Sequence, residues 1–198
     1  MEETLLSLAL GLGLAAACGF RVFVPFLVMG AAVRTGHLDV SPGFEWVGTD
    51  AALIAFAAAT VLEIAGYYVP WVDNLLDTVA TPAALVAGIL VTASVVTDAS
   101  PLVRWTLAVL AGGAAAASVQ ALTVAARQLS SFATAGLGNA VIATGETVGA
   151  VAMALMAILL PLAALAVLLV LLAVAVRWVF FGGPRRGARS VDPNGSTP

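Results

Sequence analysis

Residues 4–33 read TLLSLALGLGLAAACGFRVFVPFLVMGAAV, an apolar run that contains a single charged residue, Arg21. At a rise of 1.5 Å per residue, a helix of this length would be about 45 Å long, whereas the hydrocarbon core of a bilayer is about 30 Å thick. Gly19 and Pro25 lie on either side of Arg21, and a proline kinks a helix because it removes a backbone hydrogen bond. We therefore predict that the first helix is broken at residues 20–24. Backbone groups freed at that depth are tolerated only against protein or water, so the break should face the protein interior.

The composition of the whole chain indicates what surrounds it. Of its 198 residues, 62% are hydrophobic and 10% are charged, whereas a soluble domain carries about 25% charged residues. Several further apolar runs are about 20 residues long, which matches the thickness of a bilayer. We predict an all-α, polytopic integral membrane protein with about six transmembrane helices. The basic residues are all arginine and alanine is abundant, a composition typical of a GC-rich bacterial genome, so we expect the bacterial inner membrane.

Polar segments and prolines divide the rest of the chain. Residues 34–49 predict a loop, and residues 70–77, which follow Tyr67 and Tyr68, predict a short interfacial helix. Pro161 is the only divider within residues 139–181, and a single span after a re-entrant segment at 139–146 is the alternative. Residues 1–181 thus form a single transmembrane domain, and residues 182–198 a disordered cytoplasmic tail. The remaining predicted spans cover residues 50–69, 81–97, 102–126, 139–160 and 162–181.

The arginines predict the orientation in the membrane. Loops and tails on the cytoplasmic side carry an excess of arginine, and the last span is flanked by Arg177, Arg185, Arg186 and Arg189. The C terminus should therefore be cytoplasmic. With six spans, the N terminus should be cytoplasmic too.

The sequence also suggests an internal repeat. Residues 13–18 (GLAAAC) and 113–118 (GAAAAS) are both runs of small residues that precede a polar residue within the same apolar stretch. A Glu-x-x-Gly element follows in each half. Two halves of three spans, residues 4–98 and 101–181, must have opposite orientations, so we predict the inverted repeat found in many transporters.

Two glutamates lie within apolar runs and open the same pattern, Glu63-Ile-Ala-Gly66 and Glu146-Thr-Val-Gly149. A charge at the depth of a bilayer costs about 2.5–3.5 kcal/mol on insertion scales, so such residues face a protein interior or a wet cavity and are functional by default. We predict that Glu63 and Glu146 form a pair near the centre of the membrane, with Arg21 as a fixed counter-charge. Because these groups sum to one negative charge, they favour a proton or a cation over an anionic substrate.

A structural interpretation of the same residues is the alternative. Each glutamate would pair with Arg21 or with a hydroxyl group and fix a contact between helices, or Arg21 would extend to the membrane interface. The stretch from Gly145 to Gly149 also matches Gly-x-x-x-Gly, which favours tight helix packing or a dimer contact.

Four further polar residues are secondary candidates for a site. Arg127 ends the fourth predicted span, and Gln120 lies within it. Asp73 and Asp77 lie on one face of a helix, where their carboxylate oxygens would suit a divalent cation. More simply, these aspartates form the wet face of an interfacial helix.

The sequence contains no catalytic motif. His37 is the only histidine, and no Gly-x-Ser-x-Gly, His-Glu-x-x-His or phosphate-loop pattern occurs. We therefore expect neither an enzyme nor a cofactor, although a membrane enzyme that acts on lipid through Asp73 and Asp77 is a third interpretation. The tail arginines are explained by topology or anionic lipid rather than by nucleic acid.

Several of these features occur together in one known family. The stretch CGFRVFVP at residues 18–25, the segment PWVDNLLDT at residues 70–78, Glu63, Arg127 and Glu146 resemble the bacterial membrane family called domain of unknown function 4126. The resemblance covers roughly residues 5–165, and residues 70–77 are its most specific part. It implies the boundaries of the membrane domain and no biochemical activity.

We expect a small membrane transporter or channel-like protein for a cation, a proton-coupled ion or a small solute, with Glu63 and Glu146 as ligands and Arg21 setting the local charge. The alternative is a non-catalytic membrane protein that stabilises an assembly or organises lipid, with its buried charges as ion pairs. Six thin spans enclose little interior volume, so we also expect a homo-oligomer, most simply a dimer. The expected partners are thus the lipid bilayer, a small ion or solute, and a second copy of the chain.

Overall fold

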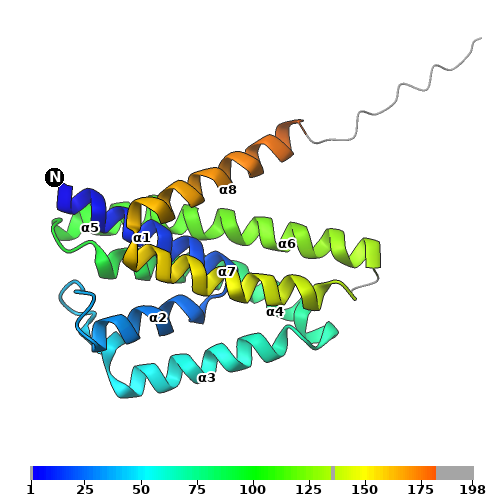
Figure 1. Ribbon diagram of the computed structural model, residues 1–198, viewed down its shortest axis with the longest axis horizontal. Coiled ribbons are helices and arrows are strands. Elements are labelled where there is room, and N and C mark those ends of the chain that lie inside the picture. Colours follow the sequence, from blue (N-terminus) through cyan, green and yellow to red (C-terminus); the bar gives the residue numbers. More distant parts are fainter. Residues whose placement is uncertain (1, 135–136, 182–198) are drawn as a thin grey trace, which may run out of the picture.

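The computed structural model describes residues 2–134 and 137–181, with the backbone alone at residues 70–71, 73–75, 77 and 178–181. The described residues form helices and their connections, so the all-α prediction is confirmed. Figure 1 shows the helices as an elongated bundle from which α8 diverges toward its C-terminal end. The predicted tail, residues 182–198, lies outside the described part of the chain.

The first apolar run folds as a helical hairpin. Helix α1 (Glu2–Phe20) and helix α2 (Phe23–Arg34) are separated at Arg21 and Val22, which confirms the predicted break. Helix α2 runs back toward the end of the bundle from which α1 starts (Figure 1). Pro25 lies in the first turn of α2, where the missing N–H leaves no hydrogen bond unmade. The sequence thus indicated where the helix breaks but not that the chain reverses there.

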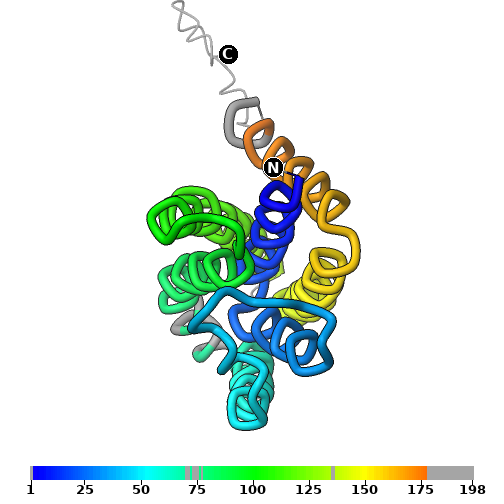
Figure 2. Tube along the Cα trace, turned by 90° about the vertical axis from the view of Figure 1, so that its left-hand side faces the viewer, coloured from blue at the N-terminus to red at the C-terminus, as the bar shows by residue number. Residues whose placement is uncertain are grey.

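Small side chains allow α1 to lie at the centre of the bundle. Figure 2 shows α1 in blue between α6 in green and the yellow and orange helices α7 and α8. A Cβ atom added at Gly13 would lie 2.7 Å from the Cβ of Ala157, and one at Gly19 would lie 2.6 Å from the carbonyl oxygen of Ala116. Only residues without larger side chains permit these close approaches. The run of small residues at 13–18 is accordingly buried throughout.

The middle of the chain forms fewer and longer helices than predicted. After the short helix η1 (Glu45–Gly48), helix α3 (Asp50–Gly66) begins at Thr49, whose Oγ1 accepts a hydrogen bond from the backbone N–H of Ala52 at 3.3 Å. Helix α4 (Pro70–Val95) is continuous through Pro82, so the prediction of a separate interfacial helix at residues 70–77 is wrong. Proline at the first helical position is favourable, and it here starts the long helix itself.

The fourth predicted span is also longer than expected. Helix α5 (Pro101–Leu107), the π-helical segment η2 (Ala108–Gly113) and helix α6 (Ala114–Thr134) form one uninterrupted helix. A Cβ atom on Gly112 would lie 2.7 Å from the carbonyl oxygen of Gly88, so η2 crosses α4 with the two backbones in close contact. The close approach expected of the small residues in this span is therefore present.

The last apolar stretch is divided as predicted. Helix α7 (Asn139–Leu159) and helix α8 (Pro161–Phe181) meet at Leu160, whose φ of −142° and ψ of 68° are not helical. Because α7 is helical from Asn139 onward, it leaves no separate re-entrant segment at residues 139–146. Four helices among the described residues are long and apolar enough to cross a membrane: Glu2–Phe20, Thr78–Val95, Pro101–Thr134 and Asn139–Leu159.

Candidate functional site

Arg21 lies at the tip of the α1–α2 hairpin and is 1% exposed. Its Nε donates a hydrogen bond to Thr147 Oγ1 at 3.1 Å, and its Nη2 donates to the carbonyl oxygen of Ala143 at 2.8 Å. The same Nη2 lies 3.3 Å from Glu146 Oε2. The side chain therefore joins the tip of the hairpin to α7 and does not extend to a membrane interface.

Arg127 meets the same carboxylate from α6. Its Nε donates to Glu146 Oε1 at 3.0 Å, its Nη2 contacts Glu146 Oε2, and its side chain is 2% exposed. Glu146 thus bridges two guanidinium groups from different segments. The sequence analysis counted one arginine and two glutamates, which sum to one negative charge. With Arg127 included, the two arginines balance the two glutamates, so that count does not describe this site.

Tyr67 completes a cluster with Arg21, Glu63, Arg127 and Glu146, and it is the member that sequence reasoning missed. The guanidinium carbons of Arg21 and Arg127 lie 4.0 and 3.9 Å from the centroid of its ring, and Tyr67 is 4% exposed. Cations over an aromatic face are attracted by the ring quadrupole, more so when water is excluded. From the sequence, Tyr67 was assigned to an aromatic belt at the membrane interface. The signal for its actual position was its spacing of four residues from Glu63, which places both side chains on the same face of a helix.

Glu63 binds the backbone of the hairpin tip. Its Oε1 accepts a hydrogen bond from the N–H of Val22 at 2.7 Å, and its Oε2 accepts one from the N–H of Phe23 at 3.1 Å. The first N–H groups of a helix have no partner within it, and no side chain local to α2 caps them. A carboxylate from α3 therefore caps α2, and its negative charge also suits the positive end of the helix dipole.

Gln120 lies on the buried face of α6 that also carries Thr123 and Arg127. Gln120 is 3% exposed, and its Nε2 has no hydrogen-bond partner among the described residues. The same holds for Nη1 of Arg21. The region around the cluster thus contains buried donors that the described part of the chain does not satisfy.

Hollows reach the cluster from two sides. One of about 330 Å³ is lined by Glu63, Tyr67 and apolar residues of α2, α3 and α4. Another of about 380 Å³ is lined by Thr123, Glu146 and apolar residues of α1, α6, α7 and α8. Glu63 and Tyr67 thus border one hollow and Glu146 borders the other.

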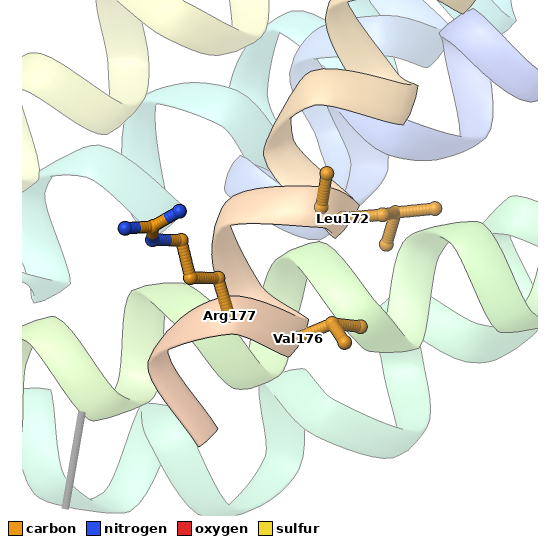
Figure 3. A pocket seen from close by; sticks show the side chains of 4 residues that line it. Leu172, Val176 and Arg177 are labelled. Carbon is orange, nitrogen blue, oxygen red and sulfur yellow. The ribbon is translucent and has the colours of Figure 1, made fainter. Parts of the chain in front are cut away.

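A larger hollow of about 550 Å³ lies elsewhere, along the outer half of α8. Figure 3 shows Arg177 extending to one side of that helix while Leu172 and Val176 extend to the other. This hollow contains no residue of the cluster. Asp73 and Asp77, the predicted surface pair, belong to α4, but their side chains lie outside the described residues.

The cluster does not have the ligands of an ordinary metal site. Within the side chains that the structure describes, no group of three or more His, Cys, Asp or Glu residues is placed to hold one. The carboxylates of Glu63 and Glu146 already accept hydrogen bonds at each oxygen. The arrangement instead concentrates hydrogen-bond donors at a break between two helices.

Comparison with known proteins identifies the family. Neither the curated proteins nor the solved structures contain a match to this chain. A family model described as Domain of unknown function (DUF4126) matches residues 8–180, which include the tip of the hairpin and every residue of the cluster. The chain therefore belongs to the family of this domain of unknown function, as the segments at residues 18–25 and 70–78 led us to expect.

Proposed function

We propose that the protein is a small membrane transporter or channel-like protein for an ion or a small solute, and that Arg21, Glu63, Arg127 and Glu146 form its transport site. The observation that carries this proposal is the meeting of ionisable side chains from the hairpin tip, α3, α6 and α7 at a break between helices. Ionisable residues inside a membrane mark ion or substrate pathways, and broken helices bind substrates in many transporters.

A structural role is the competing proposal, and the same contacts favour it in one respect. A buried ion pair with good geometry is a satisfied unit, and its loss destabilises a protein whether or not it binds anything. The Arg21–Glu146–Arg127 triad and the Glu63 cap each join segments far apart in the sequence. The distinction therefore requires a measurement of transport and of stability on the same variants.

Flux through reconstituted vesicles tests the transport proposal. We expect the wild-type protein to carry at least one species from a panel of protons, alkali cations, chloride, nitrate and formate, and we expect Glu63→Gln and Glu146→Gln to lose that flux. Glu45→Gln is the matched control, because Glu45 is exposed and accepts a hydrogen bond from the nearby N–H of Gly43 at 2.8 Å, outside the cluster. If no species crosses with wild-type protein while both cluster variants merely lose thermal stability, the structural role is correct.

The hairpin also leads to a proposed topology in the bacterial inner membrane. Because α1 and α2 start and end at the same end of the bundle (Figure 1), they contribute no net crossing in this proposal. The helices at residues 78–95, 101–134 and 139–159 are long and apolar enough to cross, and we propose that α3 and α8 cross as well. With the C terminus cytoplasmic, the N terminus lies on the other side of the membrane. The predicted inverted repeat is not part of this proposal, because the segments it equates, 13–18 and 113–118, run in the same direction. The homodimer stays a prediction.

Reporter fusions at the ends of the chain measure this topology directly. A reporter that is active only in the cytoplasm should be active at the C terminus and inactive before residue 2, and one that is active only outside should give the reverse pattern. Fusion into the loop at residues 35–44 is the control, since this loop should behave as the N terminus does. Equal cytoplasmic activity at both termini would support the even number of spans predicted from the sequence.

A further inference from the structure

The hydrogen bonds of the cluster indicate the charge of its ligand. The carboxylate oxygens are engaged, since Glu63 accepts from the backbone of Val22 and Phe23 and Glu146 accepts from two arginines. A metal cation needs oxygen ligands that are free to coordinate it. By contrast, Nη1 of Arg21 and Nε2 of Gln120 are buried donors with no partner among the described residues. These two unpartnered donors require a hydrogen-bond acceptor, which an anion would provide.

We infer that the cluster binds a small monovalent anion at the unpartnered Nη1 of the buried Arg21 guanidinium, beside Arg127, in competition with the carboxylate of Glu146. This inference rests on the proposed transport site and names the class of its ligand. Guanidinium groups bind planar oxyanions through parallel N–H donors, and charge-assisted hydrogen bonds are about twice as strong as neutral ones. The carboxylate of Glu146 is itself an internal anion at this position.

The geometry explains why an internal anion is needed. Arg21 and Arg127 both lie over the ring of Tyr67, so two positive charges are held close together in a buried place. Glu146 screens their repulsion through contacts with both. Any external anion that reaches these groups would provide the same compensation. Glu146 also lines a hollow of about 380 Å³, so open space begins at the carboxylate that an external anion would displace.

Removing the internal anion should therefore strengthen binding of an external one. Glu146→Gln keeps the size of the side chain and one acceptor oxygen but removes the negative charge between the guanidinium groups. We expect the apparent dissociation constant for chloride, nitrate or formate to fall at least about tenfold relative to wild type, because a unit charge within about 4 Å of each guanidinium is lost. Tighter binding would slow release, which agrees with a loss of flux in this variant.

The experiment measures anion-dependent thermal unfolding of the purified full-length protein in a neutral detergent. Sodium chloride, nitrate and formate are compared with sodium gluconate at equal ionic strength, since an anion that binds only the folded state raises the unfolding midpoint with its concentration. Small anions should raise the midpoint of Glu146→Gln at concentrations that leave wild type and Glu45→Gln little changed. If Glu146→Gln does not fold, Glu146→Asp provides the test, because its shorter side chain retracts the carboxylate and should also tighten binding.

The outcomes separate this inference from the proposed function. Equal midpoints in chloride, nitrate, formate and gluconate for the Glu146 variant would overturn the anion site, and cation flux lost in the same variant would leave transport standing. An anion-dependent midpoint without flux of any species would leave the anion site standing and would overturn transport.

Discussion

Replacing Arg127 with leucine is expected to lower the free energy of unfolding by about 3–5 kcal/mol, the range found when one partner of a buried ion pair is removed. Glu146 would lose the donor to its Oε1 and the closer contact to its Oε2, and would keep only Arg21 at 3.3 Å. The side chain of Glu146 is 5% exposed, so the carboxylate would be left largely buried without its closest partner. Denaturant unfolding in detergent, followed by tryptophan fluorescence, measures the change.

Arg34→Leu is the matched control for this prediction. Arg34 Nη1 lies 2.8 Å from Asp50 Oδ1, but the two side chains are 49% and 72% exposed. Exposed ion pairs contribute about 0–1 kcal/mol, so this substitution should cost little although it breaks a pair of good geometry. Equal losses of unfolding free energy in Arg127→Leu and Arg34→Leu would contradict the prediction. They would show that burial adds nothing to the strength of the Arg21–Glu146–Arg127 triad.

The charged residues at the cluster were predictable because of what a charge costs in a membrane. Arg21, Glu63 and Glu146 each interrupt an apolar run, and this cost requires a partner or a polar space for each of them. The partners themselves were not predictable from position in the chain. Arg127 ends an apolar stretch, where an arginine is adequately explained by topology, and only the extension of the helix to Thr134 places it inside the bundle.

The reversal of the hairpin was hidden for a related reason. Gly19 and Pro25 indicate a break, but a break gives no direction to the segment that follows. At the turn itself, a carboxylate from α3 binds the backbone at Val22 and Phe23, a contact across 41 residues for Val22. Periodicity and hydropathy describe one segment at a time and so cannot contain this information. The same limit explains the false interfacial helix, since aromatic residues just before α4 and aspartates in its first turns match a membrane interface as well as they match a helix start.

Glu63→Ala should have the second large effect, because the Glu63 carboxylate is the acceptor for two backbone donors at the hairpin tip. A buried donor left without a partner costs about 1–3 kcal/mol. The part-buried N–H of Val22 and the more exposed N–H of Phe23 would both lose their acceptor. The N-cap residue of α2, Val22, makes no side-chain cap of its own, so the carboxylate has no local substitute at that position. Glu63→Gln keeps one acceptor oxygen and should lose less.

Amide hydrogen exchange locates this effect as well as measuring it. In Glu63→Ala, exchange at Val22, Phe23 and Val24 should become much faster, while exchange in the middle of α3 should change little, because the cap stabilises the start of α2 and not the helix that supplies it. Thr49→Ala is the control, since Thr49 caps α3 at an exposed position, where loss of a cap costs about 1 kcal/mol and should affect only the first turn of that helix. Unchanged exchange at the hairpin tip would mean that the reversal is held by packing of α1 and α2 alone, and that the Glu63 carboxylate is available to a ligand.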